Sequence, residues 1–226
     1  MASSRPIDEL ITGTSPLAGA EQRVLREWIS QWVFDIDDFS PMAQPLARGD
    51  TLALKRDYEA HCTHLQQTLG VSEETSQQQT IQLYKTMQET RLQMPAMEVV
   101  IAGAQYHGKN DSAVTVNRHG HRISDHRGCL EILHQWGVPV DAEDVAGFTA
   151  FMRASQTAHS RLDLAKVLLE LGADVNHRSR FGGVALHEAI MAQDRVAVAF
   201  LSRNGASMDI KDNDGVSPRD IVSLIL

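Results

Sequence analysis

The sequence predicts an all-α protein, a helical-repeat solenoid of about four to five repeats with an N-terminal helical extension. Three observations lead to this fold class. Two columns of glycines recur at matching intervals along the C-terminal half. Short apolar stretches with the spacing of amphipathic helices lie between those glycines. Aromatic residues make up only 5% of the chain, so thin layers of aliphatic side chains and alanine must fill the core.

The glycine columns define the repeat period. In each column the second glycine follows the first by 35 residues, and the third follows the second by 33 residues. Because two columns share both intervals, they indicate a repeated structural unit. The columns are Gly137, Gly172, Gly205 and Gly147, Gly182, Gly215. Each unit is predicted to contain a turn, a helix, a tight loop and a second helix that ends at a glycine.

Composition excludes several classes of protein. With 42% hydrophobic and 22% charged residues, the 226-residue chain is not wholly disordered. Its net charge of −8 disfavours general binding to nucleic acid, which requires neutralisation of phosphates. Apolar runs are too short for a membrane span, and the N-terminus carries no secretory signal. Because two cysteines cannot form a disulfide scaffold, we expect an intracellular protein, cytoplasmic or nuclear.

Residues 1–40 are predicted to form the N-terminal helical extension. The Ser15-Pro16 pair opens a helix that continues to about residue 34, and one face of this helix carries an apolar stripe. The stripe consists of Val24, Leu25, Trp28, Ile29, Trp32 and Val33. Because an end repeat needs its apolar face covered, we expect this helix to cap the stack. Docking of the two tryptophans to a partner is the alternative.

Residues 41–94 are predicted to contain a degenerate first repeat and a linker helix. Within residues 42–61, Pro45 opens a short helix and the Gly49-Asp50 pair marks the tight loop after it. A further helix is predicted over residues 72–94, with Ser72 as its N-cap and Pro95 as its end.

Residues 95–226 are predicted to form the main repeat array, whose first helix covers residues 95–105. An inserted loop follows at about 106–127, rich in polar residues, glycine and histidine. We expect this loop to be exposed; contact with an acidic partner or with nucleic acid is the alternative. The last repeat begins at Ser217-Pro218, a favourable start for a helix.

Motifs in the C-terminal half resemble the ankyrin repeat, whose period is about 33 residues. Residues 182–189 read G-G-V-A-L-H-E-A and place Leu186, His187 and Ala189 at positions of the T-P-L-H-x-A signature. Residues 167–176, V-L-L-E-L-G-A-D-V-N, are similar to the end of the family's second helix. The resemblance is specific over about residues 129–226, and it implies that His187 is structural, with its ring bonded to backbone at the turn.

No motif predicts catalysis or a bound metal. The strongest set of zinc ligands would be His61, Cys62, His64 and Cys129, but a structural zinc site needs four ligands at workable spacing. His187-Glu188 lacks the second histidine of a zinc-protease helix. Neither cysteine lies in a nucleophile signature. We therefore predict no enzyme activity, no cofactor and no metal.

The resemblance implies a non-enzymatic scaffold or adaptor that binds a partner protein through the concave face and turn tips of the stack. We expect a protein partner, no membrane and no nucleic acid, with the chain as a monomer or as a subunit of a complex. Exposed aromatic residues at turn tips are favoured interface anchors. The candidate partner-binding residues are Phe148, Arg153, Gln156, Arg180, Phe181, Glu188, Met191 and Asn213.

Two other roles fit the same resemblance. The chain would be the N-terminal ankyrin part of a larger modular protein, for example one with a zinc-finger or ubiquitin-ligase module. Alternatively, it would be a subunit that recruits an enzyme or a chromatin or transcription complex. The apolar residues at 221–226 favour these alternatives, because they leave an end of the array that another element would cover.

Overall fold

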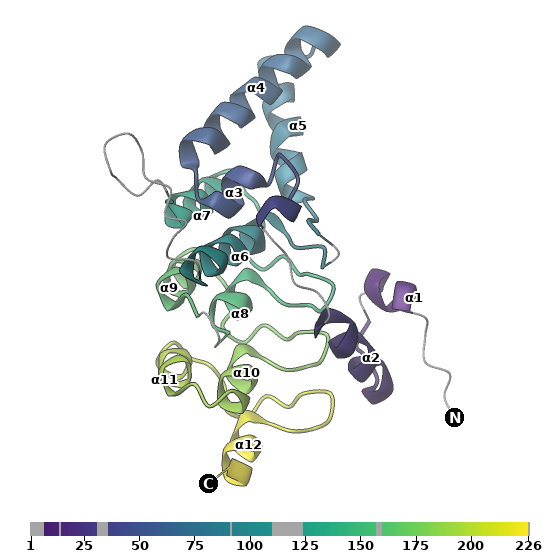
Figure 1. Ribbon diagram of the computed structural model, residues 1–226, viewed down its shortest axis with the longest axis vertical. Coiled ribbons are helices and arrows are strands. Elements are labelled where there is room, and N and C mark those ends of the chain that lie inside the picture. Colours follow the sequence, from purple (N-terminus) through teal and green to yellow (C-terminus); the bar gives the residue numbers. More distant parts are fainter. Residues whose placement is uncertain are drawn as a thin grey trace.

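The structure, a computed structural model, describes residues 7–13, 15–30, 36–90, 92–109, 124–156 and 160–225. Within these ranges the chain is helical, and the only strand-like pairing is an isolated bridge between Glu89 and Met94. The helices stack into an elongated array (Figure 1). The predicted all-α ankyrin-type solenoid is therefore confirmed.

Two columns of helices build the array. The inner column contains α3 (Gln44–Arg48), α6 (Ala96–Lys109), α8 (Ala150–Ala154), α10 (Ala185–Met191) and α12 (Pro218–Ile225). The outer column contains α4 (Thr51–Leu69), α7 (His126–Gln135), α9 (Leu162–Glu170) and α11 (Arg195–Arg203). Each inner helix from α3 to α10 packs against the outer helix that comes next after it along the chain, as the repeat unit requires. An additional helix, α5 (Glu73–Lys85), pairs with α4 and projects beyond the array (Figure 1).

A glycine allows the first two inner helices to approach closely. A Cβ atom at Gly103 of α6 would lie 1.9 Å from the carbonyl oxygen of Ala47 in α3, so only hydrogen fits there. The neighbouring outer helix is fastened to α3 as well. The Nε2 atom of the buried His126, the first residue of α7, lies 3.1 Å from the same Ala47 oxygen.

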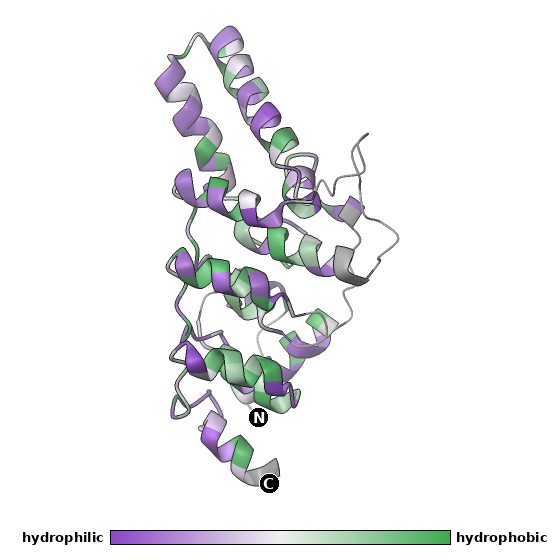
Figure 2. Ribbon diagram, turned by 90° about the vertical axis from the view of Figure 1, so that its left-hand side faces the viewer, coloured by the Kyte–Doolittle hydropathy of each residue, from purple (hydrophilic) through white to green (hydrophobic). Residues whose placement is uncertain are grey.

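Aliphatic side chains and alanine fill the space between the helix layers, as the low aromatic content predicts. The fully buried residues include Leu46, Met97, Ile101, Leu130 and Leu133. Hydrophobic residues follow the helices through the interior, and hydrophilic residues predominate along α4 and α5 (Figure 2). The aromatic exceptions gather where α4 and α5 join the array, because Trp136 stacks on Tyr58 at 4.6 Å and lies 5.1 Å from Tyr84.

Extended turns connect each outer helix to the next inner helix, and successive turns are hydrogen-bonded to each other. The backbone N–H of Val145 donates to Leu92 O, that of Arg180 to Ala146 O and that of Asn213 to Phe181 O. The glycines of both predicted columns adopt positive φ, from 72° to 99°. At Gly147 and Gly182 the lack of a side chain also lets the next turn approach, since a Cβ would lie 2.6 Å from its backbone nitrogen.

The helix predicted over residues 72–94 is shorter than expected, because α5 ends at Lys85. Residues 86–90 and 92–94 instead belong to a turn in which Thr90 and Gln93 adopt positive φ. Met94 at its end is fully buried, and Leu92 accepts the hydrogen bond from the following turn. The segment is therefore the first member of the turn ladder, a tertiary role that overrides its helical pattern.

The loop expected at about 106–127 is shorter than predicted, because helices extend into it from both sides. Helix α6 continues to Lys109 and α7 begins at His126, so only the part of this segment at 110–123 lies outside the described residues. His126 is buried against Ala47, which places it in the repeat core instead of in an exposed loop.

Two short helices precede the array, α1 (Ile7–Thr12) and α2 (Gly19–Ser30), and a 3-10 turn, η1 (Ile36–Asp38), leads into it. The helix predicted from Ser15 to about residue 34 thus covers a shorter range, and Trp32 and Val33 lie outside the described residues. The N-terminal helices also do not cover the end of the stack, contrary to the prediction. Helices α1 and α2 lie alongside the turns of the array, on the side opposite α7, α9 and α11 (Figure 1).

Candidate protein-interaction surface

The tips of three successive turns form one surface, which we call the turn-tip surface. It consists of Val145, Ala146, Phe148, Arg180, Phe181 and Asn213. Its members come from the turns before α8, α10 and α12, and the backbone ladder described above holds the turns in register. Residues 7–13 and 15–30, which we call the N-terminal segment, lie across it (Figure 1).

Arg180 is the polar centre of this contact. Its Nη1 atom donates to the carbonyl oxygens of Leu10 and Val145, each at 2.6 Å. Its Nε atom donates to Ser15 O at 3.4 Å, and its own carbonyl accepts from the N–H of Leu17 at 3.3 Å. With an exposed fraction of 6%, Arg180 binds the backbone of the N-terminal segment and is shielded from solvent.

Phe181 is the apolar centre of the same contact. It is only 3% exposed and packs in a cluster with Ala146, Leu10, Leu17 and Leu25. The expectation of an exposed turn-tip aromatic is therefore wrong for Phe181, because the N-terminal segment covers it.

The other turn-tip aromatic and a cation complete the apolar contact. Phe148 is partly buried, and its ring centroid lies 6.2 Å from that of Phe181 in a tilted arrangement. The guanidinium of Arg26 in α2 lies 4.4 Å from the Phe181 centroid. A cation over an aromatic face is attracted by the quadrupole of the ring.

Asn213 extends the contact to the last turn. Its side-chain amide donates to Leu17 O at 3.3 Å and to Arg180 O at 2.8 Å. The amide thus joins the N-terminal segment to two consecutive turns. Four of the eight predicted interface residues, Phe148, Arg180, Phe181 and Asn213, are brought together here, and the chain itself occupies the surface they form.

Arg153 has a different environment from the one predicted for it. It forms an ion pair with the fully buried Glu98 of α6, and its Nη2 donates to Asp144 Oδ2 at 2.9 Å. The other oxygen of Asp144 accepts the N–H groups of Ala146 and Phe148. Burial raises the pKa of Glu98 to about 8, although the Arg153 charge opposes that rise. Arg153 therefore connects two inner helices to a turn tip.

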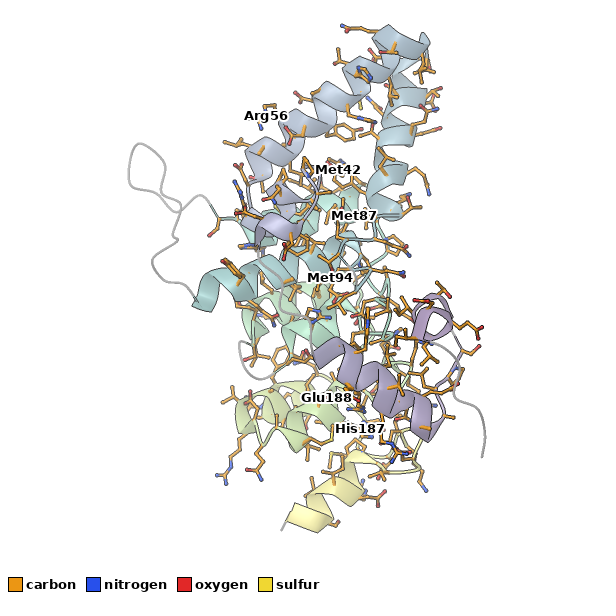
Figure 3. The ribbon with its side chains drawn as sticks, turned by 45° about the vertical axis from the view of Figure 1, so that its right-hand side comes forward. Met42, Arg56, Met87, Met94, His187 and Glu188 are labelled. Atoms are coloured by element: carbon orange, nitrogen blue, oxygen red, sulfur yellow. The ribbon has the colours of Figure 1, made fainter. Side chains whose placement is uncertain are left out.

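Glu188, Met191 and Gln156 lie on or after the inner helices. Figure 3 shows Glu188 next to His187 on α10, near α2. Burial raises the pKa of Glu188, while the positive charge of Arg26 opposes the rise. Met191 is 49% exposed, and Gln156 is partly buried after the end of α8. Of these three, only Glu188 is linked to the turn-tip surface, through the nearby charge of Arg26.

His187 has the structural role that the resemblance implies. Its Nδ1 atom accepts from the N–H of Val184 at 3.1 Å, so its Nε2 atom carries the proton and donates to Val216 O, also at 3.1 Å. The ring thus bonds the backbone at the start of α10 and fastens the next turn. Val184 has no hydroxyl, so the first N–H groups of α10 have no side-chain cap, and the imidazole satisfies the N–H of Val184 itself.

The zinc-ligand candidates do not converge. Cys62 is buried and donates to Thr80 Oγ1 at 3.3 Å, and burial raises the pKa of Cys129 to about 12. Among the residues that the structure describes, no group of three or more His, Cys, Asp or Glu is arranged to hold a metal ion. Likewise, no described helix has both the length and the apolar character needed to cross a bilayer.

Sequence reasoning missed the residues that occupy the surface. Leu10 and Leu17 were outside the predicted stripe, and Glu98 and Asp144 carried no motif. A signal was present in the aliphatic spacing of Leu10, Leu17 and Leu25, which lie seven and eight residues apart.

Comparison with known proteins places the repeat in a family. Residues 158–201 match the model described as ankyrin repeats (many copies). A putative ankyrin repeat protein of Acanthamoeba polyphaga mimivirus is 33% identical over 76 residues, which are 34% of this chain and 10% of that protein. A putative ankyrin repeat-containing protein of Treponema pallidum (strain Nichols) is 34% identical over 89 residues, 39% of this chain and 29% of that protein.

The matched segment spans about a tenth and about three tenths of the lengths of these two relatives. Ankyrin repeats generally mediate protein–protein interactions and are typically non-enzymatic. The period, the helix pairs with their glycine-ended turns, and these matches together support an ankyrin-repeat protein, and the family match itself covers residues 158–201.

Proposed function

We propose that this chain is a protein-interaction scaffold that binds a partner protein through the concave face and turn tips of its ankyrin stack. One observation carries the proposal: the turn-tip surface already holds a stretch of polypeptide. Arg180 and Asn213 bind backbone carbonyls of that stretch, and Phe181 packs on its leucines. Donors aimed at main-chain carbonyls and an apolar patch are features of surfaces that recognise peptides.

Two inner-helix residues belong to the proposed concave face. Met191 at the end of α10 is 49% exposed, and the flexible side chain of methionine adapts to varied binding partners. Glu188 one turn earlier contributes a carboxylate. A partner that binds here would contact an apolar side chain beside a negative charge.

A matched pair of variants tests the proposal. Met191 lies on the inner column, and Val196, 69% exposed, lies on the outer helix α11. Affinity capture with mass spectrometry would compare the whole chain with its Met191→Glu and Val196→Glu variants. Each captured protein would then be purified and its Kd for the three chains measured.

The expected result is a partner that the wild type and Val196→Glu bind equally and that Met191→Glu binds at least tenfold more weakly. Both residues are exposed, so circular dichroism and melting should be unchanged. Partners that respond to Val196→Glu and not to Met191→Glu would contradict the proposal, because they would place binding on the outer helices.

A further inference from the structure

The N-terminal segment is held in a way that does not depend strongly on its own sequence. The groups it offers to Arg180 and Asn213 are the main-chain oxygens of Leu10, Ser15 and Leu17. Any polypeptide with the same backbone path supplies such oxygens. The polar part of the contact would therefore accept another peptide.

The apolar part of the contact has a small buried centre of its own. Leu10, Leu17 and Leu25 bury themselves on Ala146 and Phe181 in a separate cluster, while Ile11, Trp28 and Ile29 pack, partly buried, against the edge of the main core. The main core extends continuously from Phe39 to Leu201 and has its own set of buried residues. Removing the N-terminal segment would expose the small cluster and leave the helix layers packed.

Charge adds a third element of recognition. Arg26 lies over the Phe181 ring, 4.4 Å from its centroid, and close enough to Glu188 to lower the pKa of that carboxyl against the effect of burial. A cation at this position is attracted both by the ring and by the carboxylate.

We propose that the N-terminal segment is a built-in ligand that occupies the turn-tip surface, and that a partner reaches this surface by displacing it. The displacing element would be a peptide segment of the same chemistry: aliphatic side chains in place of Leu17 and Leu25, and a cation in place of Arg26. This proposal rests on the proposed function and adds a means of regulating it. Partner affinity is reduced wherever the intact segment is in place.

Tethering makes this competition strong. The segment ends at Ser30, and η1, which leads into the array, begins at Ile36, so only a short connection joins the ligand to the array. A short connection gives an effective concentration of about millimolar. A peptide in solution must exceed that concentration, or the tethered segment must be weakened, before the peptide gains access.

The test uses a fluorescent synthetic peptide of residues 7–30 and the full chain, with binding followed by anisotropy. In the full-length Leu17→Asp/Leu25→Asp variant the tethered segment carries two buried charges and should leave the surface. We expect this variant to bind the peptide at least tenfold more tightly than the wild-type chain. Adding Arg180→Ala and Phe181→Ala should abolish that gain, because they remove both centres of the contact.

Two controls accompany the measurement. Leu52 and Leu69 of α4 are exposed, so Leu52→Asp/Leu69→Asp adds the same charge without touching the surface and should leave peptide binding at the wild-type level. A peptide that carries Asp at 17 and 25 should not bind. Equal peptide affinity for the wild type and the Leu17→Asp/Leu25→Asp variant would overturn the proposal. So would a peptide affinity that stays the same when Arg180→Ala and Phe181→Ala are added.

A second arm covers the case in which the aspartate variant melts without cooperativity. A protease recognition sequence within residues 31–35 of the otherwise wild-type chain lets the tether be cut after folding. The labelled peptide should then exchange onto the cut protein and not onto the uncut one. Failure to exchange overturns the proposal. Because no partner is needed in either arm, these outcomes are separate from the Met191 test of the proposed function.

Discussion

A pair of glycine substitutions measures how strongly successive turns are coupled. Gly182 and Gly215 have nearly the same backbone conformation, with φ of +78° and +79°. Their surroundings differ. A Cβ at Gly182 would lie 2.6 Å from the backbone nitrogen of Asn213, whereas nothing lies within 4 Å of a Cβ at Gly215. Replacing each glycine by alanine therefore applies the same backbone strain with and without a neighbouring turn.

The expected magnitudes follow from these geometries. An alanine in the left-handed region costs about 1–2 kcal/mol, and the stiffer unfolded chain offsets about 0.4–1 kcal/mol of that. Gly215→Ala should thus lower the free energy of unfolding by about 1 kcal/mol. Gly182→Ala must also displace Asn213 and its two bonds to the preceding turn, to Phe181 O at 3.1 Å and Arg180 O at 2.8 Å. At about 1 kcal/mol each, the total reaches about 3 kcal/mol.

Urea denaturation followed by far-UV circular dichroism would measure both variants against the wild type. The informative quantity is the difference between them, about 2 kcal/mol. Equal destabilisation by the two substitutions would refute the reasoning, because it would show that the turn-to-turn hydrogen bonds contribute nothing to stability. A third variant, Gly205→Ala, has open space around its Cβ and should behave like Gly215→Ala.

Three further predictions follow from the buried polar groups. Because the pKa of Glu98 is raised to about 8 in the folded chain, folding takes up a proton between about pH 4.5 and 8, and stability should fall by up to about 5 kcal/mol as pH rises through that window. His187→Ala should lower the free energy of unfolding by about 2–3 kcal/mol, because it removes the bonds to Val184 N and Val216 O. Cys129, with a pKa of about 12, should react with iodoacetamide at pH 8 only after the chain unfolds.

Each of these predictions has a measurement that would contradict it. Urea unfolding across the pH range should show a slope that Glu98→Gln removes; an unchanged slope in that variant would assign it to other groups. For His187→Ala, an unchanged urea midpoint would show that the imidazole bonds are dispensable. Rapid alkylation of Cys129 in the folded protein, located by peptide mass mapping, would show that its site opens readily.

The repeat architecture was predictable because its signals are local. Gly147 and Gly182 recur because a turn with positive φ and a close neighbour accepts no side chain, and Thr149 caps α8 by accepting from Met152 N. The contact between Leu17 and Asn213 was not predictable in this way. It joins residues 196 positions apart, and it uses a backbone oxygen that every residue carries.

The helix expected over residues 72–94 fails for a related reason. Its sequence has a helical pattern throughout, and Ser72 caps it as predicted. Yet the carbonyl oxygen of Leu92 accepts the hydrogen bond from the N–H of Val145 in the next turn. This bond joins two extended turns, so residue 92 belongs to the ladder of turns and not to a helix. Phe148, Arg180, Phe181 and Asn213 lie at turn tips, as the repeat pattern predicts. The burial of Phe181 depends on a segment whose position no local pattern encodes.

The long separation between Leu17 and Asn213 has a consequence for how the chain is made. During synthesis Leu17 leaves the ribosome well before Asn213, the residue that bonds its carbonyl, which is translated 196 positions later. At roughly 5–20 residues per second, that interval is about 10–40 s. Over this time Leu10, Leu17 and Leu25 have no complete turn-tip surface to cover them. The nascent protein therefore passes through a period in which this leucine-bearing segment is open to chaperones, and the segment closes fully over the stack only after Asn213 has been translated.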